Sequence, residues 1–157
     1  MVDTSGYRLV EGDGATAAII NNGRILLLRR VKIPFISNPG IWCMVAGKRN
    51  KGEEYRALIY REIKEETGIA REDLTLIAQV SKVRIIDAVK KDKMWDNEFF
   101  IFLSNTDKVR LDYENRAFRW ADLAEIQGER EYTNIFANKE EMLSLIKGAL
   151  YGSLDKK

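Results

Sequence analysis

The chain has 157 residues, of which 45% are hydrophobic and 32% charged, and its formal net charge is only +2. This composition predicts a soluble domain of ordinary size and excludes a disordered chain, while the small net charge disfavours a dedicated nucleic-acid or membrane-surface protein. Histidine is absent, which excludes Ser-His and Cys-His nucleophilic catalysis and zinc sites built on histidine.

The N-terminal part of the sequence contains a β-hairpin signal. Residues 1–13 show little pattern and are expected to form an edge strand or an arm. The apolar runs Ala15–Ile20 and Ile25–Arg30 flank the segment Asn21–Arg24. Because this segment contains Asn-Gly, and both central residues of a type I′ turn need a positive φ, the two runs are predicted to form a hairpin.

A loop, a strand, a basic turn and a helix are predicted next. Val31–Gly40 contains both prolines and is predicted to be an irregular loop, and Ile41–Ala46 is predicted to be a short buried strand. The basic segment Lys48–Gly52 is predicted to be a turn-forming loop. The helix is expected from about Glu53 to Thr67, because Gly68 then stands where a left-handed C-terminal residue favours glycine.

Two further strands follow the helix. They are predicted at Leu74–Ala88 and Glu98–Leu103, with a loop at Val89–Asn97 between them. The second strand has no alternation of polar and apolar residues, so it is expected to be buried on both faces.

The last part of the chain is predicted to hold a strand and a helix. The strand is Asn115–Trp120, followed by a helical turn at Asp122–Ile126. Asn138 is predicted to cap the last helix, with Glu141 in capping-box spacing. The apolar stripe of this helix comprises Met142, Leu145, Ile146, Ala149 and Leu150. The order of elements predicts one domain over residues 1–157, with a mixed sheet flanked by helices in an α+β or α/β/α-sandwich fold.

The sequence also indicates a compartment. Cys43 is the only cysteine, no apolar run approaches the roughly 20 residues of a membrane span, and no signal peptide is visible. The chain is therefore predicted to be cytoplasmic and not membrane-bound. Cys43 lies in an apolar strand and is interpreted as a small buried residue rather than a nucleophile.

The predicted helix carries three glutamates on one face. Glu62, Glu65 and Glu66 stand at i, i+3 and i+4, so they lie one turn apart and repel one another. Such a face is either solvated or holds a cation. Mg²⁺ prefers carboxylate, carbonyl and water oxygens, so Glu62 and Glu66 can grip one ion, and Glu65 can reach a second ion or a bound water.

The spacing of residues around these glutamates resembles the Nudix box. Gly47 is followed after five residues by Glu53, and after seven more by the run Arg61-Glu62-Ile63-x-Glu65-Glu66-x-Gly68-Ile69. All nine specified positions are present, so the chain resembles the Nudix hydrolases. One departure is Val45-Ala46 before Gly47, where that family usually has Pro-Gly.

The resemblance implies a Nudix-type α/β/α sandwich with a mixed central sheet and roles for the box residues. It implies that the backbone carbonyl of Ala46 completes the inner site for Mg²⁺ or Mn²⁺, and that Arg61 and Glu53 hold the loop to the helix. The general base stays open. It is Glu98, at the start of a buried strand, or Glu114, ahead of Arg119-Trp120, or a glutamate of the box such as Glu65.

Basic and aromatic residues outside the carboxylates suggest substrate contacts. Arg29, Arg30 and Lys48 are candidates for binding phosphate oxygens, with ordinary surface charge as the alternative. Trp95 is a candidate for stacking on a base, with core or interface packing as the alternative. Trp42 and Trp120 are expected in the core.

The resemblance implies an enzyme that uses a divalent metal to hydrolyse a pyrophosphate bond. The substrate would be a nucleoside diphosphate linked to another group, such as an ADP-sugar like ADP-ribose, or a (d)NTP, with water attacking phosphorus. The alternatives are a non-catalytic nucleotide-binding module of this fold and an RNA 5′-end pyrophosphohydrolase, for which a broad basic surface is expected. The oligomeric state is open, with a homodimer as one option.

Overall fold

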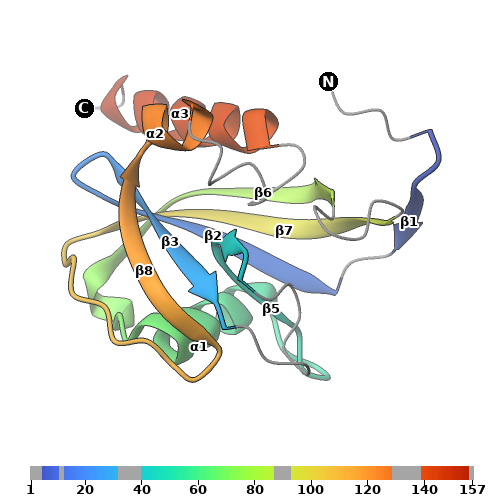
Figure 1. Ribbon diagram of the computed structural model, residues 1–157, viewed down its shortest axis with the longest axis horizontal. Helices are drawn as coiled ribbons and strands as arrows, with labels where there is room; N and C mark the ends of the chain where they lie inside the picture. The colour runs from blue at the N-terminus through green and yellow to red at the C-terminus, as the bar shows by residue number, and fades with distance from the viewer. Residues whose placement is uncertain (1–4, 11–12, 32–39, 87–92, 129–138, 156–157) are drawn as a thin grey trace.

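The computed structural model describes residues 5–31, 40–86, 93–128 and 139–155, apart from residues 11–12 (Figure 1). Its strands form one mixed sheet between two helical layers, with α1 (Tyr55–Thr67) on one face and α2 (Leu123–Gly128) and α3 (Lys139–Asp155) on the other. The predicted α/β/α sandwich is therefore confirmed. None of the described helices is long and apolar enough to span a membrane.

The predicted hairpin is confirmed and lies at the centre of the sheet. It consists of β2 (Gly14–Asn21) and β3 (Arg24–Arg30), which pair through Ile20 with Ile25 and Asn21 with Arg24. Asn22 has a φ of 50° and Gly23 a φ of 74°, as a type I′ turn requires. Over Ala15–Ile20, β2 also pairs in parallel with β7 (Lys93–Ser104).

The prediction of a single strand at Ile41–Ala46 was wrong in its extent, because two short strands occupy this region. β4 (Trp42–Cys43) pairs with β3, whereas β5 (Val45–Lys48) pairs with β2. The chain changes partner at Met44 because β2 and β3 pair directly only near their turn. As a result Gly47 lies beside Ala15 of the central strand.

The loop predicted at Val89–Asn97 was wrong over Lys93–Asn97, which belong to β7; residues 87–92 lie outside the described residues. β7 pairs along its length with β6 (Leu74–Ile86), and its first residues also pair in parallel with β1 (Arg8–Val10). Pairing on both edges overrides the weak strand propensity of the charged residues in this segment.

The helix ends follow the predicted signals. α1 begins two residues after the predicted start and ends at Thr67. It is capped by Gly68, whose φ is 75° and whose N–H donates to the carbonyl of Lys64 at 3.0 Å. A short 3₁₀ turn, η1 (Arg71–Asp73), leads to β6, and β8 (Asn115–Asp122) leads to α2. The predicted cap at Asn138 lies outside the described residues.

The sheet separates two apolar cores. Phe99 and Ile101 of β7 point to the core under α2 and α3, while Phe100 and Phe102 point to the core under α1, and all four are fully buried. This confirms the prediction that the strand is buried on both faces. Trp42 packs in the α2–α3 core, and Trp120 packs against the α1 core.

Candidate active site

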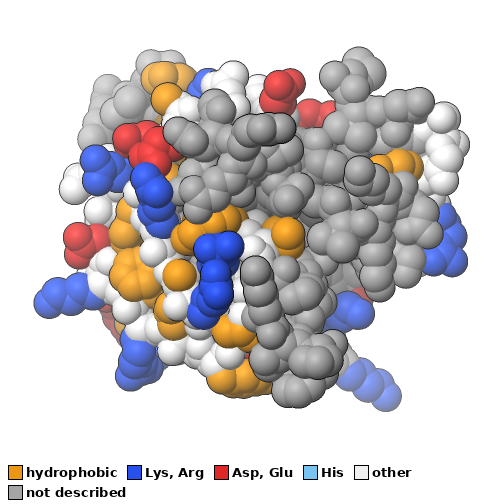
Figure 2. Space-filling model, in the orientation of Figure 1, with side chains coloured by type: hydrophobic (Ala, Val, Ile, Leu, Met, Phe, Trp, Pro, Cys, Tyr) orange, Lys and Arg blue, Asp and Glu red, His pale blue; other side chains and the backbone are white. Residues whose placement is uncertain are grey.

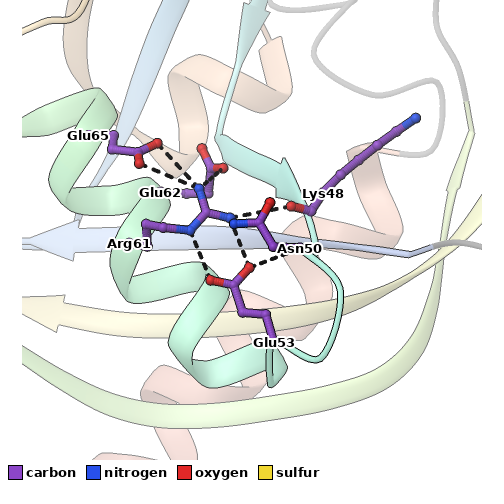
Figure 3. Close-up of polar contacts among 6 residues, drawn as sticks. All are labelled: Lys48, Asn50, Glu53, Arg61, Glu62 and Glu65. Atoms are coloured by element: carbon purple, nitrogen blue, oxygen red, sulfur yellow. Dashed lines mark hydrogen bonds and ion pairs between the residues drawn. The ribbon is translucent and has the colours of Figure 1, made fainter.

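Arg61 joins Glu53, from the first part of the box, to Glu62 and Glu65 in its second part (Figure 3). Arg61 donates through Nε and Nη2 to the two carboxylate oxygens of Glu53, each at 2.9 Å. Its Nη1 lies 3.0 Å from Oε1 of Glu62 and 3.4 Å from Oε2 of Glu65. Two parallel bonds to one carboxylate fix the position of the guanidinium as well as its charge.

The same carboxylate ties the loop before α1 to the helix. Glu53 Oε1 accepts the N–H of Asn50 at 3.0 Å, and Nη2 of Arg61 donates to the carbonyl of Lys48 at 3.4 Å. The hydrogen bonds from Arg61 and from the Asn50 backbone lower the pKa of Glu53 to about 2. Hydrogen bonds to the charged groups of Glu53 and Arg61 therefore hold the segment between β5 and α1 to the helix.

Gly47 lets the helix approach the sheet closely at Glu62. A Cβ at position 47 would lie 2.3 Å from Cδ of Glu62, a distance at which one of the two groups would have to move. Glu62 therefore packs directly over the backbone of β5. Burial raises the pKa of Glu62, and the neighbouring Arg61 works in the opposite direction.

The last glutamate of the box is buried without a full set of partners. Glu66 is 3% exposed, and its Oε2 has no hydrogen-bond partner among the described residues. Burial above all, together with the negative charges of Glu62 and Asp112, raises its pKa to about 9. In the protein alone, a proton is favoured on this carboxylate at neutral pH; a bound cation would favour the charged form instead.

A loop ahead of β8 brings further charged groups to this end of the helix. Arg30 Nη1 lies 3.0 Å from Glu114 Oε2, and the charges of Arg30 and Glu114 both act on Glu66. Asp112 was not predicted from the sequence, although its charge also acts on Glu66. The signal that the sequence offered for Asp112 was its position, two residues before the candidate base Glu114.

Glu98 makes a different set of contacts. It lies within β7 opposite Ala15, and its Oε2 accepts from Gln79 Nε2 at 2.9 Å and Ser81 Oγ at 3.3 Å. Gln79 in turn accepts from Arg56 Nε at 3.1 Å. Glu98 is thus linked to the first turn of α1, whereas Glu114 is linked to Arg30.

The other predicted substrate residues are spread around the site. Arg29 Nε donates to the carbonyl of Gly40 at 3.2 Å, and its guanidinium lies 5.8 Å from the centre of the Trp42 ring. The side chain of Lys48 extends away from the carboxylates in Figure 3. Trp95 lies in β7 rather than in a loop, and its side chain is outside the described part of the structure.

Cys43 belongs to β4 and packs against the core under α1. It is partly buried, and burial, together with the charge of Glu66, raises the pKa of its thiol to about 12. A thiol with this pKa is almost wholly protonated at neutral pH, so it is a poor nucleophile.

The carboxylates fit a hard cation in their chemistry, but their arrangement is not closed around one. No three Cys, Asp or Glu side chains of the described residues converge closely enough to hold a metal ion. Arg61 occupies one oxygen of Glu62, while the buried Oε2 of Glu66 lacks a partner. Oxygen donors of this kind suit Mg²⁺ or Mn²⁺.

The fold and the complete box define a Nudix-type hydrolase domain. A family model described as the NUDIX domain matches residues 11–144, so the chain belongs to the Nudix family, whose enzymes are pyrophosphohydrolases. No curated protein sequence matches the chain closely enough to count as a relative.

Solved structures show the same fold. An Ap4A hydrolase from C. elegans, in a binary complex, is 22% identical, with 88% of this chain and 98% of that chain covered and a TM-score of 0.67. A MutT protein from Methanosarcina mazei Go1 is 25% identical, with 90% and 94% covered and a TM-score of 0.64. A MutT Nudix hydrolase from Burkholderia pseudomallei is 30% identical, with 73% and 85% covered and a TM-score of 0.52.

Proposed function

We propose that this protein hydrolyses a pyrophosphate bond in a nucleoside diphosphate linked to another group, with Mg²⁺ or Mn²⁺ as its cofactor. The observation that carries the proposal is the buried Oε2 of Glu66, which has no partner among the described residues. An ionised carboxylate that is buried without a partner costs several kcal/mol. A divalent cation bound there would remove that cost.

The box residues receive the following roles. Glu62 and Glu66 would hold the inner cation together with the carbonyl of Ala46, and Glu65 would hold an outer cation or its water. When bound, such cations neutralise charge on the phosphates and lower the pKa of an attacking water. Arg61 and Glu53 would keep the loop from β5 in register with α1, as their paired 2.9 Å bonds suggest.

A carboxylate is needed to accept the proton of the water that attacks phosphorus. Glu65, Glu98 and Glu114 are the candidates. The charge of Glu114 acts on both Glu62 and Glu66, which supports Glu114 as the base. Glu98 is engaged by Gln79 and Ser81, which supports a structural role for it.

The substrate is proposed to be a nucleotide-type small molecule. Arg30 is 14% exposed and lies beside Glu114, so its guanidinium is suited to bind a phosphate next to the box. Lys48 and Arg29 are proposed as outer phosphate contacts, and Trp95 as a contact for the base. ADP-sugars such as ADP-ribose and (d)NTPs are the candidate substrates. Of these, ADP ribose is named as the ligand of one similar structure, the NUDIX domain of Shewanella oneidensis NrtR.

The two alternative functions have less support. A non-catalytic binding module does not require the full set of box carboxylates, which this chain has. An RNA-end hydrolase would be expected to have a broad basic surface. On the described part of the face in Figure 2, Lys and Arg side chains stand among apolar and acidic ones.

A substrate panel tests the proposal. ADP-ribose, NADH, dinucleoside polyphosphates, NDP-sugars and (oxidised) dNTPs are incubated with Mg²⁺ or Mn²⁺, and the released products are measured. Wild type is expected to cleave at least one of them only with metal, and Glu66→Gln to lose about 10³-fold in kcat. Glu140→Gln, an exposed glutamate of α3, is the control and is expected to retain activity. Absence of cleavage by wild type across the panel would contradict the proposal.

A further inference from the structure

Glu114, in the loop before β8, is held at three points. Its backbone N–H donates to Oδ1 of Asp112 at 3.2 Å, and its carbonyl accepts the N–H of Val31 at 2.9 Å. Its carboxylate lies 3.0 Å from Nη1 of Arg30. Glu114 lies outside β8, directly before its first residue. Because its N–H, its carbonyl and its side chain are all bonded, it nevertheless has little freedom to rotate.

The contact with Asp112 comes from the same loop as Glu114, and the side chain of Asp112 also reaches the sheet. The same Oδ1 also accepts from Nδ2 of Asn115 at 3.1 Å. Asn115 is 4% exposed and is the first residue of β8, where it pairs with Arg30 of β3. Asp112 Oδ1 therefore bonds both the N–H of Glu114 and a buried residue of the sheet. Aspartate commonly fixes a turn by accepting the N–H two residues along.

The position that this turn fixes is important for the box. The charges of Asp112 and Glu114 act on Glu66, and Glu114 also acts on Glu62. The Glu114 carboxylate thus lies within electrostatic range of the two glutamates proposed to hold the cation. A rotation of the loop would move this carboxylate while leaving α1 in place, because α1 is anchored separately through Arg61 and Glu53.

We propose that Asp112 is a positioning residue that sets the Glu114 carboxylate against the box glutamates, and that it acts through the hydrogen bonds of Oδ1 rather than through its charge. The proposal rests on the proposed function in one respect, since it takes Glu114 to take part in hydrolysis. The two contributions of Asp112 can be separated, because asparagine has the same Oδ1 acceptor and no charge.

The test compares Asp112→Asn with Asp112→Ala. Two quantities are measured, namely kcat on the best substrate of the panel and the hydrogen-exchange rate of the Glu114 amide. Asp112→Asn is expected to stay within about threefold of wild type in both. Asp112→Ala is expected to exchange the Glu114 amide at least about tenfold faster, and to lose about 10- to 100-fold in kcat, because a displacement of about 1 Å can cost about 10²-fold.

A double-mutant cycle tests whether Asp112 acts through Glu114. In the Glu114→Gln background, Asp112→Ala is expected to lower kcat by no more than about threefold further, because the group it positions is already disabled. Asp107→Ala is the control, since Asp107 is an exposed residue of the same loop and contacts Trp120 through its backbone carbonyl. It is expected to match wild type.

Three results would overturn the proposal. These are a loss in Asp112→Asn as large as in Asp112→Ala, wild-type behaviour of Asp112→Ala, or the full loss by Asp112→Ala in the Glu114→Gln background. If Asp112→Ala does not fold, Asp112→Asn decides alone, and a loss beyond about tenfold in this variant overturns the proposal. If wild type cleaves no substrate, the proposed function fails, while the exchange rates still decide whether Asp112 fixes Glu114.

Discussion

The first and last glutamates of the box contrast in their environments. Glu53 has two 2.9 Å bonds from Arg61 and a pKa of about 2. Glu66 is 3% exposed, has an oxygen without a partner among the described residues, and has a pKa of about 9. The same side chain therefore favours opposite protonation states within one motif.

This difference separates two tasks of the box. At Glu53 the charge is already balanced by a cation of the protein, so this end is suited to hold the loop and the helix together. At Glu66 burial and like charges disfavour the anion, and no cationic side chain bonds its Oε2 among the described residues. A cation from solution is the partner that this end lacks.

After the loss expected for Glu66→Gln, the largest effect is expected from breaking the paired end. Arg61→Gln leaves Glu53 and Glu62 without their shared cation. We expect kcat to fall about 10- to 100-fold, because a residue that orients metal ligands typically has this effect. We expect the affinity for Mn²⁺ to fall less than in Glu66→Gln, because Glu66 is not bonded to Arg61 in any contact observed, whereas Glu62 is. Steady-state kinetics and Mn²⁺ titration measure the two quantities.

Lys64→Gln is the matched control for Arg61→Gln. It removes the same charge from an exposed position of α1, where Nζ donates to the carbonyl of Gly68 at 3.3 Å. It is expected to keep kcat within about threefold. An equal loss of kcat in both variants would show that net charge, rather than the Arg61 bonds, is responsible.

A smaller effect is expected at Gly47, where Glu62 packs over the backbone of β5. Gly47→Ala places a Cβ 2.3 Å from Cδ of Glu62, so Glu62 or β5 has to shift. We expect about a tenfold loss in kcat and about 1–3 kcal/mol in the free energy of unfolding. Gly148→Ala, in open space on α3, is the control and is expected to be neutral or to stabilise by about 0.5–1 kcal/mol. Full activity of Gly47→Ala would contradict the close packing.

The smallest effect concerns acid stability at the paired end. Because the pKa of Glu53 lies near 2 instead of its ordinary 4.5, its ion pair stabilises the folded protein above pH 4.5, and this stabilisation is lost as the pH falls from 4.5 towards 2. Melting temperatures of wild type and Glu53→Gln should therefore differ most above pH 5 and converge near pH 2. Glu72→Gln, an exposed residue of η1, is the control. A difference that is constant over this pH range would exclude the ion pair as its cause.

Local signals allowed much of the fold to be predicted from the sequence. Asn22 and Gly23 marked the hairpin, and Gly68 marked the end of α1, because each needs a positive φ that few other residues adopt. The extents of β5 and β7 were missed. They depend on pairing with β2 and β1, which are distant in sequence, and no local pattern records such contacts.

The candidate site was less accessible from the sequence than the fold. The box spacing identified its glutamates, but it contains no information about which of them is paired. Asp112 was missed because its role depends on a turn beside β8 and on Asn115, and a single aspartate in a loop has no periodic signature. Glu98 and Glu114 were equivalent as sequence candidates, and only their contacts distinguish them.

The most direct test of the central claim is a Mn²⁺ titration without substrate, in which free Mn²⁺ is measured by its electron paramagnetic resonance signal. Wild type and Glu140→Gln are predicted to bind Mn²⁺ with the same affinity, and Glu66→Gln is predicted to bind at least about tenfold more weakly. Equal binding by wild type and Glu66→Gln would contradict the claim that the unpaired end of the box is the cation site.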